Sequence, residues 1–218
     1  MRYENKNLLR TLLNYEQDLR CKGHGIEEEC VFNQMKNYHC VLNSAPDIQH
    51  DFNEWNARYD LGKMFYKFIY QDKIFSLKEF NKKKNLFVNI CNDRNTIPDL
   101  TEARIKDRYL IMTSSEMLFL VENLGLIIGD IIPKKNKTWE LFITLRRIME
   151  IVMDTEVAPG SSKELKNLVI KHRSICKKLF PDDSVPFKEH VLIHYEGLRE
   201  KLGPLNEFCC IRFEGFHR

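Results

Sequence analysis

Apolar side chains recur at three- and four-residue intervals through most of the chain after residue 57, and this spacing constrains the fold more than any other feature. It is clearest in residues 58–71, where the apolar positions fall on one side of a helix. Those positions are Leu61, Met64, Phe65, Phe68 and Ile69. Residues 137–154 are apolar on most sides, which is typical of a helix packed among other helices. The pattern predicts a mainly α fold with a middle part of about five helices.

Three of the predicted helices begin with the same signal, a serine or threonine followed three residues later by glutamate. In this capping box the hydroxyl accepts a hydrogen bond from the glutamate amide, and the carboxylate accepts one from the serine or threonine amide. The pairs are Ser76–Glu79, Thr113–Glu116 and Ser161–Glu164. Later in the chain, Gly203 and Pro204 end the helix that is predicted to begin at Pro186.

Two short stretches have the composition of strands, namely residues 38–43 (YHCVLN) and residues 208–213 (FCCIRF). They flank the helical part and divide the chain into three predicted domains. The domains are a partial mixed α/β segment at residues 1–46, a helical domain at residues 47–205, and a return strand with the start of one more helix at residues 206–218.

Composition narrows the classes of function. The 34 basic and 31 acidic residues leave a net charge of only +3, so DNA binding would require local basic patches. Seven irregularly spaced cysteines, with Cys209 and Cys210 adjacent, are typical of a reducing compartment. The most apolar stretch, residues 117–132, is too short and too polar in its middle to span a bilayer. We therefore expect an intracellular protein with no membrane partner and, lacking nucleotide and hydrolase motifs, no small-molecule substrate.

Two spaced pairs of side chains could share a proton or a metal ion. Asp47 and His50 lie one helical turn apart in APDIQHD, and His190 and His194 lie four residues apart in KEHVLIHY. Each pair taken alone has a commoner explanation. Acidic residues are favoured at helix N-termini, and two histidines lack the third ligand that a metal site requires.

Short basic clusters occur at residues 81–85 (NKKKN) and 133–137 (PKKNK). Lysines neutralise phosphates, so Lys134, Lys135 and Lys137 are the candidate DNA-binding residues. The alternative explanation is that both clusters are solvated ends of helices and loops.

Several motifs, taken in their order along the chain, resemble one family of proteins. The most specific are APDIQHD, EHVLIHY followed by GPL, and IRFEGFH. Over nearly its whole length the chain is similar to the C-terminal half of CACTA-type (En/Spm-like) DNA transposases. The resemblance implies an RNase H-like core with a DDE/D triad of acids and a large helical insertion before the last acid. The helical domain would be this insertion-type domain, and the short flanking strands would be remnants of the core.

The resemblance also assigns roles to residues. Glu214 matches the third metal-binding acid, which is catalytic in an intact enzyme. Asp47 and His50 match a D-x-x-H element that supports the site, and His190 and His194 match paired histidines with a structural or supporting role. The family's chemistry requires two Mg²⁺ or Mn²⁺ ions held by three carboxylates. Its first two aspartates lie upstream of the residues matched here, so we expect neither catalysis nor a cofactor for this chain alone.

The resulting expectation is a nuclear, transposon-derived protein, truncated at both ends, that at most binds DNA or transposase subunits. Two alternatives stay open. The helical domain could be a protein–protein interaction module that the host has reused, with host proteins as its partners. The chain could instead be part of an intact metal-dependent transposase whose N-terminal half is missing from this sequence.

Overall fold

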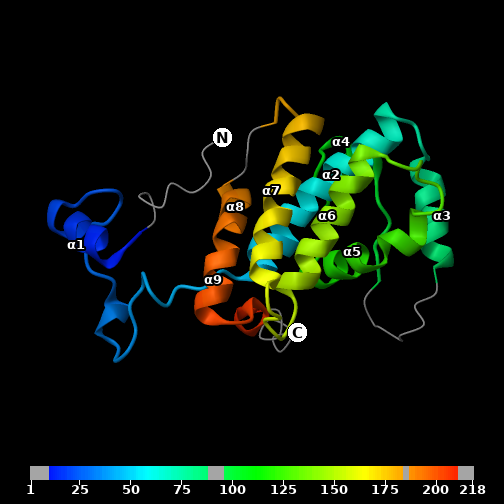
Figure 1. The fold of residues 1–218 in the computed structure, drawn as a ribbon. Coiled ribbons are helices and arrows are strands. Elements are labelled where there is room, and N and C mark those ends of the chain that lie inside the picture. The colour runs from blue at the N-terminus through cyan, green and yellow to red at the C-terminus, as the bar shows by residue number, and fades with distance from the viewer. Residues whose placement is uncertain (1–9, 88–95, 184–186, 211–218) are drawn as a thin grey trace. The chain divides into compact units, whose positions relative to one another are not determined.

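The computed structural model describes residues 10–87, 96–183 and 187–210 (Figure 1). The chain forms two compact units, Met1–Ala45 and Pro46–Arg218. Both units are helical, and the described residues contain no β-strand, which confirms the mainly α fold class. None of the described helices is both long and apolar enough to cross a membrane.

The first unit contains α1 (Leu12–Cys21) and a short 3-10 helix, η2 (Val31–Gln34). Tyr15 is the only buried hydrophobic side chain among the described residues of this unit. Its hydroxyl accepts a hydrogen bond from the Cys30 amide (3.0 Å). Polar contacts therefore contribute more to this unit than an apolar core does.

Residues 40–42 form a turn and the rest of 38–43 has no regular structure, so the strand predicted there is wrong. The Asn43 amide donates to the His39 carbonyl oxygen (2.9 Å), and Asn43 Oδ1 accepts from the His39 amide (2.8 Å). Asn33 Oδ1 accepts from the Cys40 amide (2.8 Å). Asparagine side chains thus satisfy amides that a strand would pair with a neighbouring backbone.

The second unit begins with a helix that continues without interruption from Gln49 to Gln71. Its two ends are π-helical, in η3 (Gln49–Ala57) and η4 (Lys67–Gln71), and its middle, α2 (Arg58–Tyr66), is α-helical. The backbone stays right-handed helical across both junctions. π-helical turns are rare overall, and many of those known lie at functional sites. This makes η3 a candidate position for a functional site.

The remaining elements of the second unit are α3 (Leu77–Leu86), α4 (Glu102–Lys106), α5 (Ser114–Ile128), α6 (Lys137–Val152), α7 (Ser161–Leu179), α8 (Phe187–Val191), η5 (Leu192–His194), α9 (Tyr195–Leu202) and η6 (Leu205–Phe208). α6 confirms the buried helix predicted from its sequence. α7 lies alongside α6 (Figure 1). α7 also packs on α9, and α8 packs on η3.

The apolar face predicted for α2 and η4 is buried in one core with side chains of α5 and α6. Exposure is at most 1% at Leu61, Met64, Phe65 and Phe68.

Gly62 shows how closely the chain packs against this helix. A Cβ atom at that position would lie 2.4 Å from the carbonyl group of Arg108, which is too close for any side chain.

The capping boxes predicted at Ser76 and Thr113 are confirmed. The third, at Ser161, is wrong, because Gly160 occupies the N-cap of α7 with φ of 82°. Glycine adopts this left-handed conformation without strain, so the helix begins one residue earlier than predicted. The Ser161 hydroxyl donates instead to the Ala158 carbonyl oxygen (2.6 Å).

The return strand predicted at residues 208–213 is wrong as far as the described residues extend. Phe208 ends η6, and the Cys209 amide donates to the Asn206 carbonyl oxygen (3.1 Å) in a tight turn. Residues 211–218 lie outside the described residues.

Candidate functional site

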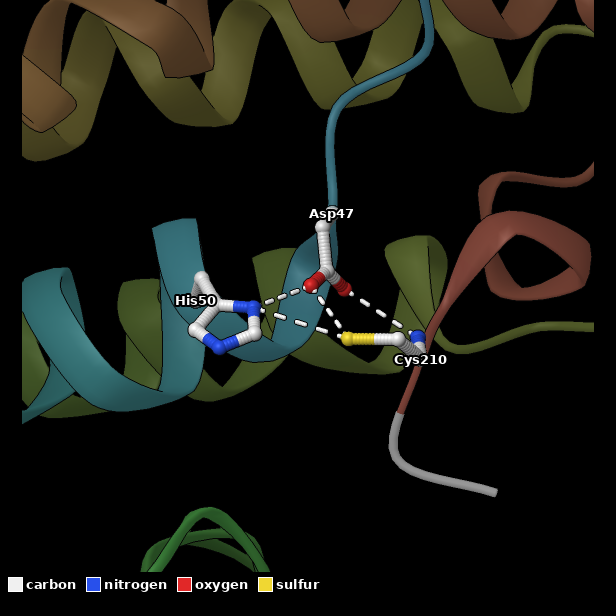
Figure 2. Close-up of side chains that lie close together, drawn as sticks. All are labelled: Asp47, His50 and Cys210. Atoms are coloured by element: carbon white, nitrogen blue, oxygen red, sulfur yellow. Dashed lines mark hydrogen bonds and ion pairs between the residues drawn. The ribbon is translucent and has the colours of Figure 1, made fainter. Parts of the chain in front are cut away.

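Asp47, His50 and Cys210 converge in the second unit, with the Asp47 carboxylate between the other two side chains (Figure 2). Asp47 Oδ2 is hydrogen-bonded to His50 Nδ1 and lies 2.6 Å from Cys210 Sγ. Asp47 Oδ1 accepts from the Cys210 amide (3.2 Å), and the sulfur lies 3.5 Å from His50 Nδ1. We call these three residues the Asp47 cluster.

Two distant parts of the sequence supply the Asp47 cluster. Asp47 precedes the first helix of the unit, where its Oδ1 also accepts from the Gln49 amide (3.1 Å). His50 follows three residues later, so helical geometry brings it beside Asp47. Cys210 is 163 residues further along and follows η6, which is anchored in the core by the fully buried Leu205.

The pKa of Asp47 is lowered by its neighbours. Partial burial by itself raises this pKa, but hydrogen bonds from the Cys210 thiol, the His50 ring and two backbone amides outweigh burial. The carboxylate is therefore ionised at neutral pH and acts as the common acceptor for the donors around it. Hydrogen bonds to a charged acceptor are stronger than those between neutral groups.

Lys188 of α8 extends these polar contacts to a neighbouring helix. Its Nζ donates to the His50 carbonyl oxygen (3.1 Å), lies 3.6 Å from Asp51 Oδ1 and stands 5.6 Å from the centre of the Trp55 ring. Burial raises the pKa of Asp51, Lys188 opposes that rise, and the charge of Asp47 adds to it. Lys188 thus attaches α8 to η3 beside the Asp47 cluster.

Tyr195, the first residue of α9, is fully buried near these carboxylates. Burial raises the pKa of its hydroxyl well above the ordinary value, and Asp51, Asp47 and Cys209 raise it further. The hydroxyl is neutral and has no hydrogen-bond partner among the described residues. Leaving such a group unsatisfied costs about 1–3 kcal/mol.

The buried face of η3 carries polar side chains where a packed helix normally has apolar ones. Gln49, Asn53 and Asn56 are each at most 4% exposed. Asn56 Nδ2 donates to the Asp51 carbonyl oxygen (2.6 Å), and Asn53 Nδ2 donates to Ser114 Oγ (3.1 Å). Gln49 also contacts the Asp47 cluster, because its Oε1 accepts from Cys210 Sγ (3.7 Å).

The Asp47 cluster offers one oxygen, one nitrogen and one sulfur atom that lie within 4.8 Å of one another. Such a mixed set suits Zn²⁺, with the fourth position filled by another ligand. It does not suit Mg²⁺ or Mn²⁺, which prefer oxygen ligands. Without an ion, the three side chains form a hydrogen-bonded contact between the start and the end of the described second unit.

The structure pairs His190 and His194 with each other. Their Nε2 atoms lie 3.3 Å apart and their rings meet edge to face at 5.0 Å. Neither histidine belongs to the ligand groups found among the described residues. Glu214 lies outside those residues, so its role stays a prediction.

The candidate DNA-binding lysines lie in the turn after α5 and at the start of α6. Lys134 and Lys135 are exposed in the connecting turn, and Lys137 begins α6 with its Nζ 2.8 Å from Glu140 Oε2. In the other basic stretch, residues 81–85, two lysines form ion pairs with carboxylates of distant segments. The turn at 133–137 is thus the better candidate for contact with phosphates.

Cys210 is the site residue that sequence reasoning missed. Its neighbour Cys209 suggested only a reducing compartment, and no spacing rule connects residues 163 positions apart. The one available signal was the set of polar residues Gln49, Asn53 and Asn56. Buried polar residues in a helix usually have hydrogen-bond partners, so these residues indicated a polar contact nearby.

No protein-family model, curated protein or solved structure matches this chain.

Proposed function

We propose that residues 47–205 are the helical insertion domain of a CACTA-type DDE/D transposase and that residues 206–218 return the chain towards the last acid. We propose further that this chain binds DNA or transposase subunits without catalysing a reaction alone. One observation carries the proposal. Asp47 and Cys210 are hydrogen-bonded to each other across 163 residues of chain. An insertion leaves a core and returns to it at neighbouring positions, so its two ends must lie together.

The residues that make this contact belong to the motifs that resemble the family. Asp47 and His50 lie in APDIQHD, and Cys210 directly precedes IRFEGFH. The unit between them has its own apolar core, built from α2, η4, α5 and α6. A domain of this kind can be inserted into another fold without disturbing it.

Catalysis is assigned to the intact transposase. Among the residues of this chain, only Glu214 matches an acid of the family's triad, and it lies four residues after Cys210 in the sequence. A single carboxylate cannot hold two divalent ions in position for phosphodiester chemistry. Mg²⁺ or Mn²⁺ would therefore bind only where the other acids are present.

DNA contact is assigned to the turn at residues 133–137. Lys134 and Lys135 are exposed there, and the N-terminus of the 16-residue helix α6 begins beside them. A helix N-terminus has a partial positive charge, which adds to that of the lysines and favours phosphate.

The test is fluorescence anisotropy of a labelled mixed-sequence DNA duplex titrated with the 218-residue chain at several salt concentrations. We expect simultaneous charge reversal of Lys134, Lys135 and Lys137 to glutamate to weaken binding by about tenfold or more. The slope of log K against log salt should fall by about 0.9 for each phosphate that the variant no longer neutralises.

The matched control reverses three exposed lysines of α7, namely Lys163, Lys177 and Lys178. If both triple variants bind equally well, the turn at 133–137 does not bind the DNA. Manganese-dependent nicking of supercoiled DNA by this chain, abolished by Glu214→Gln, would overturn the assignment of a non-catalytic role.

A further inference from the structure

A second group of side chains with metal-ligand chemistry lies between α2 and α7. Asp60 comes from α2, and His172 and Cys176 lie four residues apart on α7. His172 is completely buried, and 12% of the Asp60 side chain is exposed. Residues on one helix face at this spacing can both reach a single ion.

We propose that Asp60, His172 and Cys176 bind one Zn²⁺ ion through Asp60 Oδ1, His172 Nε2 and Cys176 Sγ. The site is separate from the Asp47 cluster and does not depend on the proposed function. A zinc ion bound by one carboxylate, one imidazole and one thiolate is a familiar combination, with water completing the tetrahedron.

The distances between the ligand atoms come close to those of one tetrahedral ion. The Cys176 side chain must turn towards Nε2 on binding, because its Sγ lies almost as near to His172 Nδ1 (4.0 Å). Metal–ligand bonds of zinc place neighbouring ligand atoms about 3.3 to 3.7 Å apart. Cys176 Sγ lies 3.8 Å from His172 Nε2 and 3.8 Å from Asp60 Oδ1. The third pair, His172 Nε2 and Asp60 Oδ2, is hydrogen-bonded at 2.8 Å. On binding, Zn²⁺ takes the place of the hydrogen on His172 Nε2, the ring stays neutral with its hydrogen on Nδ1, and the Cys176 thiol releases its proton to solvent. Asp60 Oδ1, which lies 3.8 Å from the sulfur, is the carboxylate ligand.

The charges also favour an ion at this position. A carboxylate and a thiolate together neutralise the charge of Zn²⁺, and the imidazole binds in its neutral form. Lys63, one turn after Asp60, is already paired with Asp183 (2.9 Å) and so does not compete for the carboxylate. Cys176 is half-buried and 12% of the Asp60 side chain is exposed, so solvent reaches these two ligands but not His172.

A bound ion would connect two helices that otherwise meet through few side chains. α7 packs mainly on α6 and α9, and α2 packs mainly on η3, η4, α4 and α6. A zinc ion here would attach α7 directly to the central helix of the core. We therefore expect zinc to stabilise the folded chain, because an ion that binds only the folded state adds to its stability.

The test uses Co²⁺ as a spectroscopic substitute for Zn²⁺ on the chelator-treated 218-residue chain. Cys210→Ser removes the sulfur of the Asp47 cluster and serves as the background. In that background we expect a thiolate-to-cobalt charge-transfer band at one equivalent of metal, displaced by Zn²⁺. The double variant Cys176→Ser/Cys210→Ser should lose the band while its circular dichroism spectrum remains helical.

A second variant tests the carboxylate. In the same background, Asp60→Asn should keep the thiolate band but weaken zinc binding by about tenfold or more, and should reduce the rise in melting temperature that zinc produces. If Cys210→Ser shows no thiolate band, or if the band survives in the double variant, the proposal is wrong. The three side chains are then a buried ion pair with a neighbouring thiol and nothing more.

Discussion

At the scale of single residues, Gly62 determines how closely the segment at Arg108 approaches α2. Gly62→Ala forces a Cβ atom against backbone, and we expect it to lower the free energy of unfolding by about 1–3 kcal/mol. Gly125→Ala is the matched control in α5, because the nearest atom to its Cβ is a flexible arginine nitrogen at 3.7 Å. That change should be neutral or stabilise by up to about 1 kcal/mol. Equal effects of the two substitutions in urea denaturation would contradict the close approach at Gly62.

Tyr195 provides a second test at this scale, because its buried hydroxyl has no partner among the described residues. Tyr195→Phe should therefore leave the free energy of unfolding unchanged or raise it by about 1 kcal/mol. Tyr109→Phe is the matched control, since the Tyr109 hydroxyl accepts a hydrogen bond from Arg58 Nη1 (3.1 Å). Tyr109→Phe should lower the free energy of unfolding by about 1–2 kcal/mol. A larger loss for Tyr195→Phe than for Tyr109→Phe would show that the Tyr195 hydroxyl has a partner.

Contacts between residues that are close in sequence were predictable, and contacts between distant residues were not. The spacing of Asp47 and His50 predicts their contact, because helical geometry alone brings them together. Their contact with Cys210 depends on the path of the whole second unit, which no local pattern encodes. The same holds for Asp60 with His172, which are 112 residues apart.

At the scale of elements, the most periodic helices were predicted and the strands were not. About five helices were expected in the middle part, where the described residues contain eight α-helices, and the helix expected after Pro186 is divided into α8, η5 and α9. Periodic apolar residues identify α2 and α6 because a buried helix face must recur every turn. Residues 38–43 have strand-like composition, but composition does not supply a partner strand, and asparagine side chains satisfy their amides instead. The π-helical form of η3 had no signal in the apolar pattern.

The junction of η3 with the end of η6 should weaken in acid. The folded-state pKa of Asp47 is lower than that of an unfolded aspartate, so the unfolded chain binds more protons as the pH falls. The stabilisation is fully present above about pH 4 and is lost as the pH falls through the folded-state pKa. In urea denaturation at a series of pH values, the difference in unfolding free energy between the wild type and Asp47→Asn should shrink below about pH 4.

The control for this pH series is Asp107→Asn, which changes an exposed carboxylate. Its difference from the wild type should stay small throughout. A difference for Asp47→Asn that is constant down to about pH 2 would mean that the carboxylate is not held in its ionised form by these hydrogen bonds.

At the scale of the whole molecule, the chain consists of two units, and the second carries the core and the candidate sites. The resemblance to transposases leads to the expectation that a helical insertion begins near Asp47 and returns near the end of the chain. The contact of Asp47 with Cys210 fits that expectation, although the strands expected on either side are not present in the described residues. The fold class was therefore predictable from the sequence, but the connection between the two ends became apparent only in three dimensions.

A double-mutant cycle between Asp47 and Cys210 tests the insertion-domain proposal most directly, because the proposal depends on the contact between these two residues. Urea denaturation would be measured for the wild type, Asp47→Asn, Cys210→Ala and the double variant in the presence of a metal chelator. We expect a coupling energy of about 1 kcal/mol or more, as is found for side chains in direct contact. Effects that add to within about 0.5 kcal/mol would mean that the two residues are not in contact, and the proposal would lose its main support.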